Sequence, residues 1–138
     1  MATGKIVWED GNMSVKIAEI DQQHKALVNL INNLFDAIKE GKSNQIFEKL
    51  ISDLIKYTQF HFSTEEKYFT QHAYPETQLH KAKHQEFVET VLRFKKDFDA
   101  GKTGLTMGIL DFLRDWLVKH IMGEDRKYSA FLLSKGVR

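Results

Sequence analysis

The segment LIKYTQFHFSTEEKY, residues 54–68, predicts a helix with an unusual buried face. Side chains on that face recur at alternating spacings of three and four residues: Leu54, Tyr57, His61, Glu65 and Tyr68. His61 and Glu65 stand at positions where a leucine would be expected. The segment therefore indicates a helix whose inward face carries side chains able to bind a metal.

The same spacing recurs in four segments of the chain, roughly residues 17–40, 44–72, 77–100 and 105–122. Glycine or proline follows each of the first three segments, as expected where helices end. Because the connections are short, successive helices should be antiparallel neighbours. The sequence predicts an all-α fold, an up-down-up-down antiparallel four-helix bundle.

Shorter segments flank the four predicted helices. Residues 1–16 are expected to form an extended N-terminal arm, with Val7 and Trp8 as packing anchors. Three residues near the other end predict a short C-terminal helix: Tyr128, Phe131 and Leu132. Neither segment interrupts the bundle pattern.

Composition limits the classes of protein that this chain can belong to. A length of 138 residues with 42% hydrophobic side chains suits one domain, residues 1–138, with its own core. A net charge of +1, with acids and bases interspersed, gives no indication of a nucleic-acid partner. The chain has no cysteine, so thiolate metal sites are excluded. Without a signal peptide or an apolar stretch of about 18 residues, we expect a cytoplasmic protein with no membrane segment.

Five of the six histidines lie on the inward faces of the predicted helices, and residue counts place them at one depth. His24 lies 18 residues before a turn near position 42, and His61 lies 19 residues after it. At a rise of about 1.5 Å per residue, both lie about 27 Å from that end. His84 and His120 lie about 18 residues on either side of the turn between positions 102 and 103, at the same depth. Glu65 and His84 lie 9 and 10 residues from the turn near position 74.

His80 joins this layer because it lies four residues before His84, on the same helix face. Asp125 follows His120 by five residues, and on a regular α-helix the two would point about 140° apart. The helix must loosen between them if Asp125 is to reach the layer. Gly123 is well placed to permit this.

Histidine nitrogen and carboxylate oxygen together suit Fe, Mn or Zn, and the lack of sulfur argues against a closed structural zinc site. The competing interpretation is that each polar residue is an ordinary core residue with its own hydrogen bonds. That interpretation would need about seven separately satisfied buried networks in one layer, so packing alone is disfavoured. The sixth histidine, His72, lies beyond the layer and is expected at the surface.

Other metal and phosphate motifs are incomplete. The spacing of His80 and His84 is that of a zinc protease, but the glutamate that would follow His80 is missing. Gly101-Lys102-Thr103 lacks the upstream glycine of a phosphate-binding loop. No Glu-x-x-His occurs, which weakens a ferritin-like interpretation.

The order His24, His61-x3-Glu65, His80-x3-His84, His120-x4-Asp125 resembles the hemerythrin family in its bacterial form. The surroundings match as well, in Ile20-Asp21-Gln22-Gln23 before the first histidine and Trp116-Leu117 before the last. The resemblance covers nearly the whole chain. It implies a non-haem di-iron centre with an oxo- or hydroxo-type bridge. The implied ligands are His80, His84 and His120 on one iron, His24 and His61 on the other, with Glu65 and Asp125 bridging.

In that arrangement the iron with two histidines is five-coordinate, so one position is open to a small ligand. The resemblance implies that dioxygen binds there reversibly, taking two electrons and a proton. Apolar neighbours would exclude water. Matching positions nominate six pocket-wall residues, for which ordinary core packing is the alternative: Leu27, Val28, Phe62, Trp116, Leu117 and Ile121.

Three functions remain open from the sequence. The leading hypothesis is a non-enzymatic protein that binds O2 for carriage, storage or supply, including supply to an oxygen-using enzyme. The second is an oxygen- or redox-sensing domain of a larger signalling protein. The third is a di-iron oxidase or peroxidase, which would be expected to have more carboxylates. The residues alone do not distinguish iron from manganese or zinc.

Overall fold

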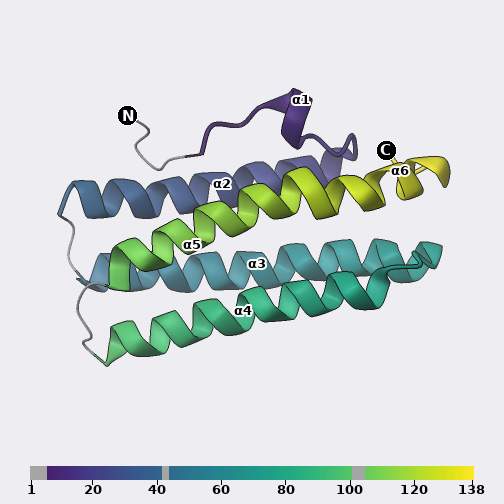
Figure 1. Ribbon diagram of the computed structural model, residues 1–138. Coiled ribbons are helices and arrows are strands. Elements are labelled where there is room, and N and C mark those ends of the chain that lie inside the picture. The colour runs from purple at the N-terminus through teal and green to yellow at the C-terminus, as the bar shows by residue number, and fades with distance from the viewer. Residues whose placement is uncertain (1–5, 42–43, 101–104) are drawn as a thin grey trace.

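The computed structural model describes residues 6–41, 44–100 and 105–138. The described residues are mostly helical and contain no strand (Figure 1). The elements in chain order are α1 (Asp10–Met13), α2 (Ala18–Lys39), α3 (Asn44–His72), α4 (Thr77–Asp99), α5 (Leu105–Lys119), the π-helical turn η1 (His120–Asp125) and α6 (Arg126–Ser134).

Helices α2, α3, α4 and α5 form an antiparallel bundle. Each packs against the next in the chain, and α5 returns to pack against α2. The end of α2 and the start of α3 lie at one end of the bundle, whereas the connection from α3 to α4 lies at the other (Figure 1). The predicted four-helix, up-down-up-down fold is confirmed, and three of the four predicted segments agree with the observed helices to within about one residue.

The fourth predicted segment differs, because α5, η1 and α6 follow one another without a break (Figure 1). The predicted closing helix is therefore α6, a continuation of α5. Gly123 lies within η1, and its φ is not in the left-handed region.

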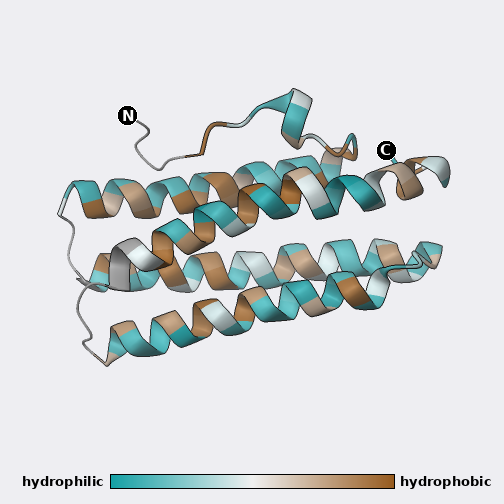
Figure 2. Cartoon of the chain, viewed as in Figure 1, coloured by the Kyte–Doolittle hydropathy of each residue, from teal (hydrophilic) through white to brown (hydrophobic). Residues whose placement is uncertain are grey.

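Hydrophobic and hydrophilic residues alternate along each helix of the bundle (Figure 2), and the buried side chains are mostly hydrophobic. They form two separate apolar clusters. One includes Leu34, Leu54 and Leu113, and the other includes Ile20 and Leu132. Among the buried members, α2 and α3 contribute to both clusters, α4 and α5 to the first and α6 to the second, and the predicted ligand layer falls at the boundary. A polar layer thus divides the core in two.

The end of α3 is set by local backbone geometry. Ala73 adopts the left-handed conformation with φ 54°, and the N–H of Tyr74 donates to the carbonyl of Phe69 at 2.9 Å. This is the 6→1 bond of a Schellman helix end, and the following Pro75 cannot continue the helix. The turn lets α4 begin at Thr77 and return antiparallel to α3.

The N-terminal arm differs from its prediction in two respects. It contains the single helical turn α1, and Val7 is 74% exposed, so the prediction that Val7 is an anchor is wrong. The backbone of Ile6 exchanges two 2.8 Å hydrogen bonds with the Asn32 side chain, which directs Ile6 inward and its extended neighbour outward. Trp8 packs against the core as predicted.

Within the ranges that the structure describes, no helix has both the length and the apolar character that crossing a bilayer requires.

Candidate metal centre

The seven residues nominated from the sequence meet in one buried layer, and none is more than 5% exposed. Their side-chain atoms form two groups that could each hold a cation. One group is Glu65, His80, His84 and His120, and the other is His24, His61, Glu65 and Asp125. Within each group the candidate ligand atoms lie within 4.8 Å of one another. Glu65 belongs to both.

The two carboxylates lie between the histidine groups. Oδ1 of Asp125 is 3.0 Å from Nε2 of His120 and 3.1 Å from Nε2 of His80, whereas its Oδ2 is 3.0 Å from Nε2 of His24. Each oxygen therefore faces a different histidine group.

Glu65 repeats this arrangement from α3. Its Oε1 is 3.0 Å from Nε2 of His84, and its Oε2 is 3.3 Å from Nε2 of His61 and 3.4 Å from Nε2 of His24. Two carboxylates that each present one oxygen to each group have the geometry needed to bridge a pair of cations.

The turn η1 explains how Asp125 reaches the layer. A π-helical turn closes with bonds between residues five apart, so His120 and Asp125 come to the same face. The predicted loosening of the helix is confirmed. Such turns are rare and occur frequently at functional sites.

Several buried polar atoms of the layer residues make no hydrogen bond to any residue that the structure describes. They are both ring nitrogens of His24, Nε2 of His84, Oε1 of Glu65 and both oxygens of Asp125. Buried polar atoms ordinarily have partners, so this many unsatisfied atoms need an explanation. Cations bound by the converging Nε2 and carboxylate oxygen atoms would satisfy all of these except Nδ1 of His24, and the residues present fit a metal pair.

The pKa values show which groups carry charge without a cation. Burial lowers the pKa of His24, but the nearby carboxylates of Asp125 and Glu65 outweigh burial and raise it to about 9. The same balance, with Glu65 and Glu66 as the carboxylates, raises the pKa of His84 to about 9. Burial raises the pKa of Glu65, but the surrounding histidines hold it well below its ordinary value. Ionised carboxylates thus face histidines whose protons a metal would displace.

Burial dominates at His61, where it lowers the pKa. Burial and Glu65 raise the pKa of Asp125, but His120 and His24 outweigh them and lower it. These shifts favour an ionised Asp125 and a neutral His61, which are the protonation states that bind metals.

Three residues outside the nominated set contact the candidate ligands from behind. The hydroxyl of Tyr128, which is fully buried, donates to Oε2 of Glu65. Nδ1 of His61 lies 2.7 Å from Oε1 of Gln23, and Nδ1 of His84 lies 3.0 Å from Oε2 of Glu66. Sequence reasoning placed Tyr128 in the closing helix without a role. For Gln23 and Glu66, the available signal in the sequence was a polar residue directly beside a candidate ligand.

Among the six nominated pocket-wall residues, the aromatic ones contact histidine rings of the buried layer. Phe62 stacks on His84 with ring centroids 3.7 Å apart, and Trp116 stacks on His120 at 4.3 Å. The four aliphatic ones are all buried: Leu27, Val28, Leu117 and Ile121. All six belong to or pack against the larger apolar cluster, which is also what ordinary core packing would give.

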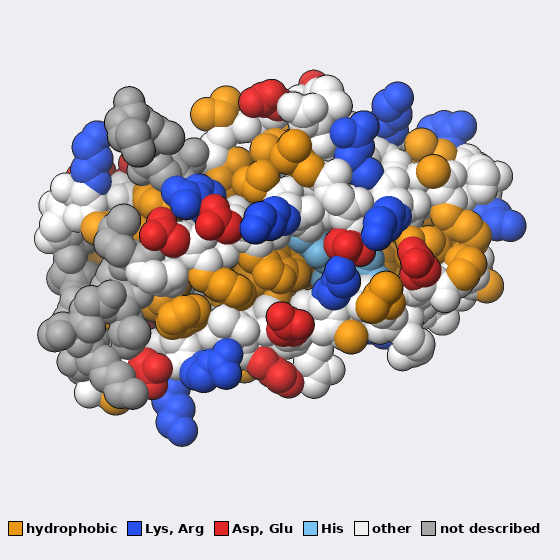
Figure 3. All heavy atoms as spheres, viewed as in Figure 1, with side chains coloured by type: hydrophobic (Ala, Val, Ile, Leu, Met, Phe, Trp, Pro, Cys, Tyr) orange, Lys and Arg blue, Asp and Glu red, His pale blue; other side chains and the backbone are white. Residues whose placement is uncertain are grey.

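The layer lies close beneath one face of the molecule. A small area of histidine side chain is visible there between acidic and basic side chains (Figure 3). His72, predicted at the surface, is partly exposed and belongs to neither ligand group.

Comparison with known proteins agrees with this geometry. The model of the hemerythrin HHE cation binding domain matches residues 15–132. The chain belongs to the hemerythrin family. That family is known for oxygen binding at a di-iron site, and its members bind non-haem iron.

Individual hemerythrin relatives match over most of the chain. A bacteriohemerythrin of Methylococcus capsulatus is 31% identical over 127 residues, which cover 92% of this chain and 96% of the relative. A bacteriohemerythrin of Pseudomonas aeruginosa is 33% identical over 123 residues, covering 89% and 78%. A crystal structure of wild-type hemerythrin matches with a TM-score of 0.86 at 30% identity, covering 92% of this chain and 97% of that one.

Proposed function

We propose that the protein binds dioxygen reversibly at a non-haem di-iron centre, for oxygen carriage, storage or supply. The observation that carries the proposal is the unequal division of the buried ligands. Three histidines gather on one side of two shared carboxylates, and two histidines gather on the other. With both carboxylates shared, the side with two histidines has one ligand fewer.

We assign the ligands as the family resemblance implies, and the distances in the layer support the assignment. His80, His84 and His120 would hold one ion, and His24 and His61 the other. The carboxylates of Glu65 and Asp125 would bridge the two ions. A ferrous pair, when bound, supplies the two electrons that reversible dioxygen binding requires.

The remaining residues would shape and protect the open position. Leu117 lies about one helical turn before His120, and Ile121 directly follows it. Both side chains are buried. With Leu27, Val28 and the ring of Phe62, they would exclude water and hold the site apolar. Excluding water and stray protons would slow autoxidation, the irreversible reaction that competes with oxygen release.

The test is a cycle of reduction and oxygenation. The iron-loaded protein is reduced without oxygen, exposed to air, and then deoxygenated under argon. Air should produce a charge-transfer absorption band that disappears on deoxygenation and returns over several cycles, with two irons per chain by metal analysis. A band that forms once and never reverses would refute reversible binding. Sustained consumption of oxygen and reductant above the autoxidation rate would instead favour an oxidase or peroxidase.

A sensor is the second candidate, and contacts of the N-terminal arm favour it. The hydroxyl of Ser129 donates to the carbonyl of Val15 at 2.7 Å, and Arg126 reaches the carbonyl of Asn12. The arm is thereby tied to the segment that directly follows Asp125. If oxygen binding shifts that ligand, hydrogen exchange in the arm should differ between the reduced and oxygenated forms. A cytoplasmic location and a fusion to signalling domains remain predictions.

A further inference from the structure

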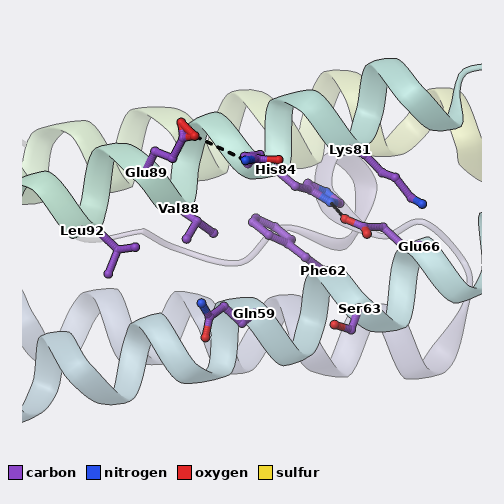
Figure 4. A pocket seen from close by; sticks show the side chains of 10 residues that line it. Gln59, Phe62, Ser63, Glu66, Lys81, His84, Val88, Glu89 and Leu92 are labelled. Carbon is purple, nitrogen blue, oxygen red and sulfur yellow. Dashed lines mark hydrogen bonds and ion pairs between the residues drawn. The ribbon is translucent and has the colours of Figure 1, made fainter.

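Two of the candidate ligand histidines have different hydrogen-bond acceptors behind them. Glu66, on α3, lies behind His84 of α4, and its Oε2 is 3.0 Å from Nδ1 of that ring. The pair lies at a surface pocket of about 570 Å³ between α3 and α4, also lined by Phe62 and Glu89 (Figure 4). The acceptor behind His84 is therefore a carboxylate within reach of water.

His61 has a neutral acceptor in a closed environment. Its Nδ1 lies 2.7 Å from Oε1 of Gln23, which is 6% exposed. Nε2 of Gln23 donates to Oγ1 of Thr64 at 3.3 Å, and the Thr64 hydroxyl donates to the carbonyl of Phe60. This chain fixes the amide so that its oxygen faces the histidine.

These acceptors determine where each ring carries its proton. A carboxylate or an amide oxygen can only accept, so Nδ1 of both His84 and His61 must be protonated. Nε2 of each ring is then the nitrogen left to bind a cation, and it faces Glu65 at 3.0 Å from His84 and 3.3 Å from His61. Both rings are oriented to give the same nitrogen to the centre, but one is backed by a negative charge and the other is not.

We propose that Glu66 and Gln23 are positioning residues that make the two metal positions unequal. A carboxylate partner makes a ligand imidazole more basic, and a hydrogen bond to a charged acceptor is stronger than one to a neutral acceptor. The three-histidine position, backed by Glu66, is then the tighter and more electron-rich of the two. The inference rests on the ligand assignment of the proposed function but not on oxygen binding.

The chain provides a matched control for the charge of Glu66. Glu89 lines the same pocket, and its carboxylate accepts from Gln85 and not from a histidine (Figure 4). Glu66→Gln keeps an acceptor oxygen and removes the charge, and Glu89→Gln makes the same change on α4, five residues after His84. Because Glu66 is 30% exposed, its substitution should leave the fold intact.

The experiment titrates metal-free full-length protein with Co²⁺ by calorimetry at pH 7. Two binding steps of unequal affinity are expected for the unsubstituted chain. Glu66→Gln should weaken the tighter step by about 10- to 100-fold, the effect typical of losing such a partner, and leave the weaker step within a factor of about three. Gln23→Glu should tighten the weaker step, and Glu89→Gln should change neither. Urea unfolding of the metal-free variants checks that folding is unaffected.

A second measurement separates electronic from purely structural effects. In iron-loaded protein, Glu66→Gln should raise the reduction potential of the centre, because the lost negative charge had stabilised the ferric form, whereas Glu89→Gln should not. The proposal is overturned if Glu66→Gln and Glu89→Gln behave alike, or if Glu66→Gln weakens both steps equally. It is also overturned if the unsubstituted chain binds no Co²⁺, a result that would remove the di-iron function as well. Unequal Co²⁺ binding without reversible oxygenation would refute the proposed function alone.

Discussion

Replacing Tyr128 with phenylalanine tests whether the buried carboxylate layer is held from behind. The phenol is fully buried among Phe69, Tyr74 and His80, and its hydroxyl donates to Oε2 of Glu65. Phenylalanine keeps the ring and its packing, so the substitution removes one hydrogen bond and leaves a buried carboxylate oxygen with one donor fewer.

The environment of this bond sets the expected magnitude. Hydrogen bonds to charged groups contribute about 1.5–3 kcal/mol, and a buried acceptor that loses its donor incurs the full cost of desolvation. Tyr128→Phe should therefore lower the free energy of unfolding of the metal-free protein by about 2 kcal/mol. Tyr68 makes an otherwise similar bond to Glu19 at 2.6 Å on the exposed side of α3. Because water replaces that bond easily, Tyr68→Phe should cost less than about 0.5 kcal/mol.

The assay is urea unfolding of both variants, followed by circular dichroism, with Co²⁺ titration of the folded proteins alongside. Tyr128→Phe should also weaken metal binding by about 10-fold or more, since Glu65 loses an orienting partner, and Tyr68→Phe should not. Equal losses of stability in the two variants, or unchanged Co²⁺ affinity in Tyr128→Phe, would refute the reasoning. The position of the Glu65 carboxylate would then not depend on its hydrogen bond from Tyr128.

Three further predictions concern the same layer. His61→Ala should lower the iron content towards one per chain and abolish oxygenation, whereas full iron content and oxygenation would show that His61 is not a ligand. Leu117→Ala should speed autoxidation and cost about 2–5 kcal/mol of stability, and an unchanged autoxidation rate would remove Leu117 from the barrier against water. The raised pKa values of His24 and His84, about 9 against 6.5, should give the metal-free protein stability that is fully present below about pH 6.5 and lost as pH rises through about 9. Metal competes with those protons, so Zn²⁺ affinity should rise over the same pH range with measurable proton release. A Zn²⁺ affinity that does not change with pH would contradict the assignment of His24 and His84 as metal ligands.

The amino-acid sequence by itself determined the fold and the seven polar residues that meet in the buried layer. Spacings of three and four residues define one face of each helix, and the fixed rise of a helix converts residue counts into depth. His24 and His61 could therefore be placed together from their distances to one turn. Asp125 reaches the layer only where the helix departs from regular geometry, and its five-residue spacing from His120 already indicates the departure that η1 provides.

Only the tertiary structure decided which side-chain atoms form hydrogen bonds with one another around the buried layer. The partners of Tyr128, Gln23 and Glu66 lie 63, 38 and 18 residues away in the chain, and such contacts depend on how helices are rotated against one another. Periodicity assigns a residue to a face but does not fix that rotation to within a hydrogen bond's length. The arm shows the same limit, because Val7 and Ile6 are equally apolar, and the bond between Ile6 and Asn32 decides which of them is buried.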